Sequence, residues 1–286
     1  YKFTYVNLLV RVIAIIVVLV IVNKWTNPAN KLSWTFLILL SPIFGLMVYF
    51  LFGRSGLTKH TRERMDAVNR QVEALFQRDS AVEKGLEKES RSAYLQSSYI
   101  DKWAGFPLYQ NTQTKYYSCG EEMFPDMLEA LRGAKHFIFL EYFIIEEGYM
   151  FNTILDILEE KAKAGVDVRF IYDDVGSINS ISFGYYKKLQ ERGIPCVTFN
   201  PFKPLISVVM NNRDHRKIFV VDGYIGFTGG INLADEYINK VKRFGYWKDT
   251  GVRIEGEAVW SLTAMFLEMW NYINRSTEDY SRFLPS

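Results

Sequence analysis

The chain has 286 residues, of which 49% are hydrophobic and 16% are aromatic, and its formal net charge is +2. This composition excludes an intrinsically disordered chain, and the near-neutral charge excludes a surface that is basic throughout. Cys119 and Cys196 lie far apart in the sequence and fit no metal-ligand or redox spacing. We interpret them as reduced core thiols of a cytosolic domain.

Two apolar runs open the chain, at about residues 5–22 and 34–52. A helix needs about 20 apolar residues to cross a bilayer, and the second run reaches that length without a charge. Pro42 and Gly45 are tolerable within it. The first run contains Arg11 and could also be a signal peptide, but no small-residue cleavage site follows it. The pattern predicts a two-helix transmembrane hairpin over residues 1–53.

Basic residues flank this hairpin unequally. The loop between the runs carries Lys24 and Lys31. The segment after the second run is richer in positive charge, with Arg54, Lys59, Arg62 and Arg64. The positive-inside rule therefore predicts a multi-pass protein of the cell membrane, with everything after Phe52 facing the cytoplasm.

Residues 54–104 form a basic juxtamembrane and helical linker. Apolar residues at helical spacing give it one stripe, made of Met65, Val68, Val72, Leu75 and Phe76. The stripe could pack on the following domain or lie on anionic lipid. Acidic residues mixed through the polar face favour packing on the domain.

Residues 105–286 read as an α/β domain. Helical patterns over residues 120–134, 150–165, 181–193 and 257–274 alternate with apolar strands over 135–145, 166–174 and 194–199. A further strand is expected at residues 250–256. Such alternation, with continuous apolar strands, predicts a mostly parallel sheet covered by helices.

The stretch "RKIFVVDGYIGFTGG" predicts a strand, a turn at Asp222–Gly223 and a second strand. His215 and Lys217 share one face of the first strand, with Cα atoms roughly 7 Å apart, so a ring nitrogen and an ammonium can converge on one anion. The hairpin returns Gly229, Gly230 and Asn232 to the same neighbourhood. Asp222 has the opposite parity, so its spacing indicates a turn residue.

These residue types suit a phosphate ester. A histidine can attack phosphorus, a lysine and an asparagine amide can neutralise the charge that develops, and glycines let a backbone approach a ligand closely. A single histidine beside a strand is usually structural. However, the pattern H-x-K, four residues, D, six residues, GG-x-N is matched at every position by His215, Lys217, Asp222, Gly229, Gly230 and Asn232. The full pattern favours a catalytic site.

This pattern resembles the HKD motif of the phospholipase D superfamily. The apolar hairpin followed by "LFGR", together with "TKYYSCGEEMF", "IFLEYF", "YDDVGS" and "YWKDTGVRIEG", narrows the resemblance to the bacterial cardiolipin synthases. The resemblance implies that two phosphatidylglycerol molecules are joined to give cardiolipin and glycerol, at the surface of an anionic membrane. It also implies a reaction that passes through a phosphohistidine intermediate and uses no metal or other cofactor.

The resemblance also implies roles for individual residues. His215 would be the nucleophile, and Lys217 and Asn232, with Gly229 and Gly230, would hold the phosphate. Asp222 is the third residue of the motif and is expected to support the site. Asp249, in "YWKDTGV", is the candidate for orienting the His215 ring.

Only one copy of the motif is present, because neither His60 nor His136 is followed by a matching pattern. The family uses two copies, and the second supplies the acid that protonates the leaving alcohol. We therefore expect residues 105–286 to be the first of two catalytic halves. The second half would lie in the same full-length chain, of which this sequence starting at Tyr1 would be a trimmed piece, or in a partner chain.

Other assignments stay open at this stage. Hydrolysis by a membrane-bound phospholipase D and a dimeric single-motif nuclease are alternative functions, although the hairpin and the missing basic stripe argue against nucleic acid. Asp173 and Asp174 are interpreted as turn formers in preference to metal ligands. Glu141 lies in an apolar strand and needs a buried partner. The loop at residues 200–212 could face the substrate.

Overall fold

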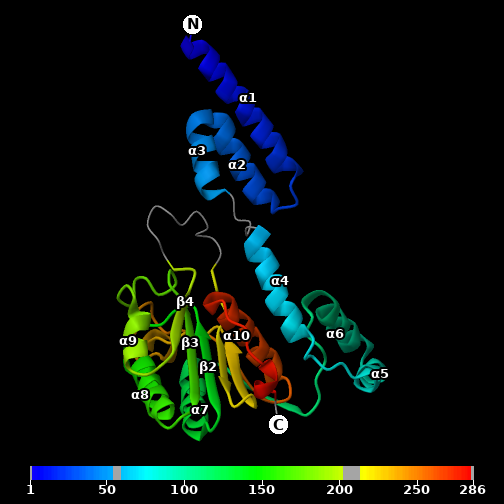
Figure 1. The fold of residues 1–286 in the computed structure, drawn as a ribbon, viewed down its shortest axis with the longest axis vertical. Coiled ribbons are helices and arrows are strands. Elements are labelled where there is room, and N and C mark those ends of the chain that lie inside the picture. Colours follow the sequence, from blue (N-terminus) through cyan, green and yellow to red (C-terminus); the bar gives the residue numbers. More distant parts are fainter. Residues whose placement is uncertain (1, 54–58, 202–212, 285–286) are drawn as a thin grey trace. The chain divides into compact units, whose positions relative to one another are not determined.

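The computed structural model describes residues 2–53, 59–201 and 213–284. Their contacts separate two compact units. The helical unit consists of the described residues up to 53, and the sheet unit consists of the described residues from 59 onward. Figure 1 shows the elements of both.

The helical unit consists of α1 (Lys2–Asn23), α2 (Pro28–Leu40) and α3 (Pro42–Phe52). Within α1, the segment Thr4–Asn23 has a mean hydropathy of 2.8 and is long and apolar enough to cross a membrane. Among the described residues it is the one helix with that property. Ala14 and Ile21 of α1 are buried against Ile38 of α2 and Leu46 of α3.

The second apolar run was expected to be one continuous helix, and it folds as the two helices α2 and α3. Ser41 has φ −137° and ψ 84°, outside the helical region, and Pro42 has no N–H to continue the ladder. The chain then turns back, which brings the rings of Trp34 and Tyr49 to 5.5 Å between centroids. Gly45 permits the turn, because a Cβ there would lie 2.6 Å from the Cα of Ile38. With 13 residues, α2 is about 20 Å long, too short to cross a bilayer alone.

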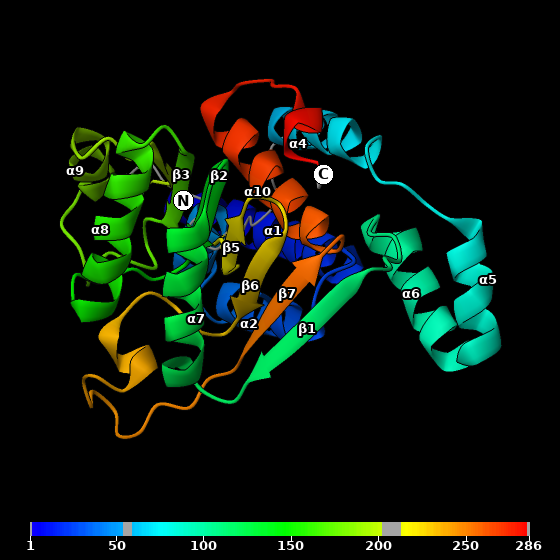
Figure 2. The ribbon, with the colours of Figure 1, turned by 90° about the horizontal axis from the view of Figure 1, so that it is seen from below.

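The sheet unit is built on a seven-stranded sheet among the described residues, in the order β1-β7-β6-β5-β2-β3-β4. The strands are β1 (Thr112–Tyr117), β2 (Phe137–Tyr142), β3 (Asp167–Asp173), β4 (Cys196–Phe199), β5 (Ile218–Val221), β6 (Ile225–Gly229) and β7 (Gly251–Gly256). Helices α7 (Gly120–Gly133), α8 (Tyr149–Lys163) and α9 (Tyr185–Glu191) belong to one layer, and α10 (Val259–Asn274) packs on the other face (Figures 1 and 2).

The α/β class is confirmed, but the sheet is mixed and not mostly parallel. Among the seven named strands of the described residues, β2–β3 and β3–β4 pair in parallel, because helical crossovers through α8 and α9 join them. The pairs β2–β5, β5–β6, β6–β7 and β1–β7 are antiparallel. The hairpin between β5 and β6 turns at Asp222 and Gly223, whose φ values of +53° and +66° suit the predicted Asp-Gly turn.

The linker folds into α4 (Lys59–Glu73), α5 (Ser80–Glu89) and α6 (Arg91–Ala104). Val72 of α4 is fully buried in the core cluster that includes Trp260 and Phe266 of α10, and Leu75 and Phe76 pack against that cluster. The apolar stripe of the linker therefore packs on the sheet unit, as its mixed polar face favoured.

Candidate active site

His215 and Lys217 converge on the ring of Phe143, the residue that follows β2. The His215 and Phe143 ring centroids are 4.6 Å apart, and Lys217 Nζ lies 5.5 Å from the Phe143 centroid. Lys217 Nζ also donates a hydrogen bond of 2.9 Å to the carbonyl of His215. The His215 side chain is exposed, whereas Lys217 is 4% exposed. The pair is thus a reachable imidazole beside a nearly buried ammonium.

The two faces of this segment have separate environments. Lys217 has the parity of Phe219 and Val221, which are buried in the core beneath α7 and α8. Arg216 has the opposite parity, shared with Ile218 and Val220, which pack against α10. The strand alternation that predicted a common side for His215 and Lys217 therefore continues before β5 begins.

Asp249 lies close to Lys217 and influences its charge. Burial lowers the pKa of Lys217, and the negative charges of Asp249 and Asp214 act in the opposite direction. Asp249 Oδ1 accepts a hydrogen bond of 2.8 Å from the Thr250 N–H. Among the hydrogen bonds of the described residues, none joins Asp249 to His215, so its orienting role stays a prediction.

The two glycines of the motif make room for Asp249 and its neighbour. A Cβ on Gly230 would lie 1.9 Å from Asp249 Oδ1, and a Cβ on Gly229 would lie 2.4 Å from the Thr250 carbonyl oxygen. Gly229 also has φ +146°, which strongly favours glycine. The glycines were expected to let the backbone approach a phosphate closely. In the structure, the Asp249–Thr250 segment lies in that close position.

Asn232 is nearly buried, and hydrogen bonds hold its amide on both sides. Its Oδ1 accepts from the Ile144 N–H at 3.1 Å, and its Nδ2 donates to the Tyr237 hydroxyl at 2.7 Å. Tyr237 is in turn close enough to Asp249 for the two to interact electrostatically. These contacts bring Asn232 into the cluster that contains Asp249 and Lys217, and one of its two amide hydrogens is used there.

Asp222 lies at the opposite end of β5. Its carboxylate accepts hydrogen bonds from the backbone N–H groups of Lys135, His136 and Phe137, at 2.8, 2.7 and 2.9 Å. Four residues of extended chain lie between it and Lys217, and five steps along a strand span roughly 16 Å. The geometry assigns Asp222 to the start of β2 and not to the reacting phosphate, in agreement with its turn parity.

An Asp222→Ala variant should lose stability before it loses chemistry. Removal of one carboxylate leaves three N–H groups without their acceptor, and the free energy of unfolding should fall by about 2–3 kcal/mol. Thermal unfolding followed by circular dichroism would measure the loss. Activity should decline in proportion to the folded fraction, and inactivity of fully folded protein would show instead that Asp222 acts in the reaction.

Several site residues were missed or only partly placed by the sequence. Phe143 and Tyr237 were not predicted, because an aromatic residue beside a strand end carries no signal of its own. The buried Glu141 has an ionic partner, as an acid in an apolar strand requires, and that partner is the partly exposed Arg216. Asp173 accepts from the Gly176 and Asp214 N–H groups. The predicted substrate-facing loop lies largely outside the described residues.

The described part of the chain has no group of three His, Cys, Asp or Glu side chains that could hold a metal ion. The chemistry that this cluster can perform with its own groups is nucleophilic attack by the exposed imidazole and neutralisation of an anion by the ammonium.

Comparison with known proteins adds to this geometry. The family model "Cardiolipin synthase, PLD-like domain" matches residues 127–270, which include every candidate site residue, and "Phospholipase_D-nuclease N-terminal" matches residues 12–54. Cardiolipin synthase 1 of Bacillus anthracis is 35% identical over 98% of this chain and 55% of its own length. Cardiolipin synthase 1 of Bacillus cereus is 36% identical over 95% of this chain and 53% of its own.

The chain thus spans about half the length of these curated relatives. Among solved structures, the phospholipase D family member Nuc from Salmonella typhimurium matches with a TM-score of 0.42 and 22% identity, over 59% of this chain and 97% of that chain. The relatives quoted above are bacterial, and together with α1 they fit a bacterial membrane protein.

Proposed function

This chain belongs to the family of cardiolipin synthases with a phospholipase D-like domain, and from that membership we propose that it is one half of a phosphatidyltransferase. The reaction would join two phosphatidylglycerol molecules into cardiolipin and release glycerol. The observation that carries the proposal is the convergence of His215 and Lys217 on Phe143, with the charge of Asp249 beside Lys217.

The first step would be attack of a neutral His215 ring nitrogen on the phosphorus of one phosphatidylglycerol. A nitrogen–phosphorus bond forms, and the bond from phosphorus to the glycerol head group breaks. The glycerol oxygen leaves with a proton from a general acid, which the second motif would supply. A hydroxyl of the second phosphatidylglycerol then attacks the phosphohistidine, loses its proton to the same group and frees His215.

Lys217 would neutralise the added negative charge as phosphorus becomes five-coordinate. Its near-complete burial strengthens that interaction, because water screens it little, and Asp249 and Asp214 favour its protonated form. The second amide hydrogen of Asn232 could donate to the same phosphate oxygens. Asp249 would orient the His215 ring once a substrate is bound.

The proposed partners follow from the same chemistry. The substrate is an anionic membrane lipid, and α1 would hold the sheet unit at that membrane, on its cytoplasmic side. The second half would come from the same full-length chain or from a partner chain.

Incubation of the intact protein with phosphatidylglycerol and analysis of the lipids would test the proposal. Cardiolipin and glycerol in equal amounts are expected. Phosphatidic acid without cardiolipin would assign the protein to hydrolysis, and no turnover in a folded, membrane-inserted preparation would refute an enzymatic role.

A further inference from the structure

We propose that Arg216 is a positioning residue of the candidate active site. Its guanidinium, anchored to Glu141 and Asp214, would fix the side to which His215 points. The importance of this role for catalysis rests on the proposed function, whereas the positioning concerns the geometry of this chain alone.

The guanidinium of Arg216 bridges two carboxylates that belong to different parts of the fold. Its Nη2 lies 2.7 Å from Oε1 of Glu141 in β2, as an ion pair without the alignment of a hydrogen bond. Its Nε donates a hydrogen bond of 3.0 Å to Oδ1 of Asp214, in the segment that precedes β5. Glu141 is fully buried and Asp214 is 5% exposed. A lysine has a single ammonium in place of the planar guanidinium, so it could not bridge both carboxylates in this way.

The residues on both sides of His215 are therefore anchored. Asp214 also donates its backbone N–H to Asp173 Oδ2 at the end of β3, at 3.0 Å. Arg216 holds the following position to β2. With positions 214 and 216 tied to two neighbouring strands, strand alternation directs the side chain between them away from Arg216 and toward Phe143.

The electrostatics indicate that this arrangement serves geometry more than stability. Burial raises the pKa of Glu141 well above its usual range, and the charge of Arg216 opposes that shift. Burial would lower the pKa of Arg216, but Glu141 and Asp214 outweigh it and the pKa is raised. Removing the Glu141 carboxylate from water offsets much of its attraction to the partly exposed Arg216, so a role in fixing one conformation explains the pair better than a gain in stability.

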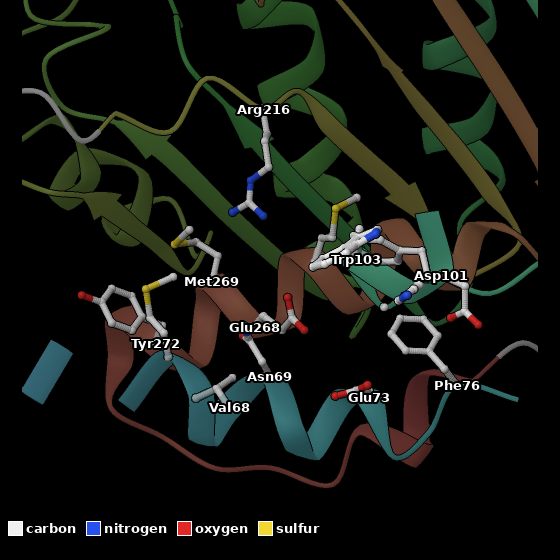
Figure 3. Close-up of a pocket in the computed structure, with 16 residues that line it drawn as sticks. Val68, Asn69, Glu73, Phe76, Asp101, Trp103, Arg216, Glu268, Met269 and Tyr272 are labelled. Atoms are coloured by element: carbon white, nitrogen blue, oxygen red, sulfur yellow. The ribbon is translucent and has the colours of Figure 1, made fainter. Parts of the chain in front are cut away.

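Arg216 lines a cavity of about 530 Å³ whose lining residues do not include His215. Helices α4 and α10 line it, together with residues 101–106, and Figure 3 shows Arg216 directed toward Glu268 and Met269 of α10. Burial raises the pKa of Glu268 to about 7, and the charge of Arg216 opposes that shift. In a variant that lacks the Arg216 side chain, a small cation could therefore reach the guanidinium site through this cavity without passing His215.

The test uses a double variant that removes both charges of the Glu141–Arg216 pair, Glu141→Leu with Arg216→Met. The histidine rings are labelled with ¹³C, and the His215 signal is assigned by its absence from His215→Ala. Because the Phe143 ring lies 4.6 Å from the His215 ring, its ring current should move the wild-type His215 signal away from the position of a free imidazole. In the double variant it should move toward the position of a free imidazole, while the His136 signal stays in place.

The rate of phosphatidyl transfer should also fall in the double variant. We expect a loss of about tenfold or more, mostly in kcat with KM little changed, because a misplaced nucleophile still allows lipid to bind. An unchanged His215 signal in the folded double variant would overturn the proposal. If the signal moves but the wild type makes no cardiolipin, the proposed function fails and the positioning role stands.

Chemical rescue can distinguish the contribution of the planar guanidinium geometry from that of its positive charge. Arg216→Ala opens the guanidinium site to the cavity, and added guanidinium should restore the His215 signal and the transfer rate more than ammonium at equal concentration. Equal restoration by both ions would overturn the assignment to the planar fork. His215→Ala should gain nothing from either ion.

Discussion

Replacement of His215 by alanine should abolish covalent labelling by a phosphatidyl donor and lower the transfer rate by about 10⁴-fold or more. The reason is that His215 is the exposed imidazole that lies, with the buried Lys217, against Phe143. Without the covalent intermediate, the acceptor hydroxyl would have to displace glycerol directly. Mass spectrometry of the acid-labile adduct on the peptide that contains residue 215 would measure the labelling.

His136→Ala is the matched control. This histidine is also exposed and lies in the same unit, and its backbone N–H, which the substitution leaves in place, makes its contact with Asp222. We expect it to keep the labelling and the rate of the wild type. Undiminished labelling of the His215 variant would remove the nucleophile assignment and the mechanism built on it.

Gly230→Ala should cost about 10²-fold in transfer rate, because it displaces Asp249 from beside Lys217. The new Cβ would lie 1.9 Å from Asp249 Oδ1 and 2.5 Å from its Cγ, so the carboxylate has to move. The overpacked site should also lose about 1–3 kcal/mol of stability. Steady-state kinetics and thermal unfolding of the same preparation would measure both.

Gly133→Ala at the end of α7 is the matched control, since its Cβ would meet nothing within 4 Å, and it should be neutral. The effect at Gly230 acts through Asp249 only if Gly230→Ala with Asp249→Ala is no slower than Asp249→Ala alone. Additive losses would contradict that route.

The pH profile gives a second readout for Asp249. Its charge raises the pKa of Lys217, so Asp249→Asn should lower that pKa further. Because the ammonium is the form that neutralises phosphate, activity is lost as pH rises through this pKa. The alkaline limb of the profile should therefore move to lower pH.

The elements of the sheet unit were predictable where the signal is local. Helical periodicity and glycine stops predicted most of its helices. The Asp222–Gly223 pair predicted the β5–β6 hairpin. The pairing of β5 beside β2 was not predictable, because it depends on contacts between Glu141 and Ile218 and their neighbours, far apart in the sequence. The edge strand β1 has mostly exposed polar residues and gives no apolar pattern.

The candidate site shows the same division. Spacing alone placed His215 and Lys217 on one side of their strand and Asp222 in a turn. It assigned the glycine pair to a close approach of a ligand, and it could not identify Asp249, which lies against Gly230 in the structure. Glu141 was recognisable as an acid in need of a partner, but nothing in the sequence identified Arg216 as that partner.

The fold-back at Ser41 leads us to a different expectation of how the chain crosses a bilayer. Because α2 and α3 lie side by side in opposite directions, we expect them to enter one leaflet and return, so that α1 would be the single traversal. An odd number of traversals puts the start of α1 and the sheet unit in different compartments. Lys24 and Lys31 then join the later basic residues at one leaflet, in better agreement with the positive-inside rule. A cysteine at the exposed Trp25 should resist an impermeant maleimide applied outside cells, and its labelling would favour two full traversals.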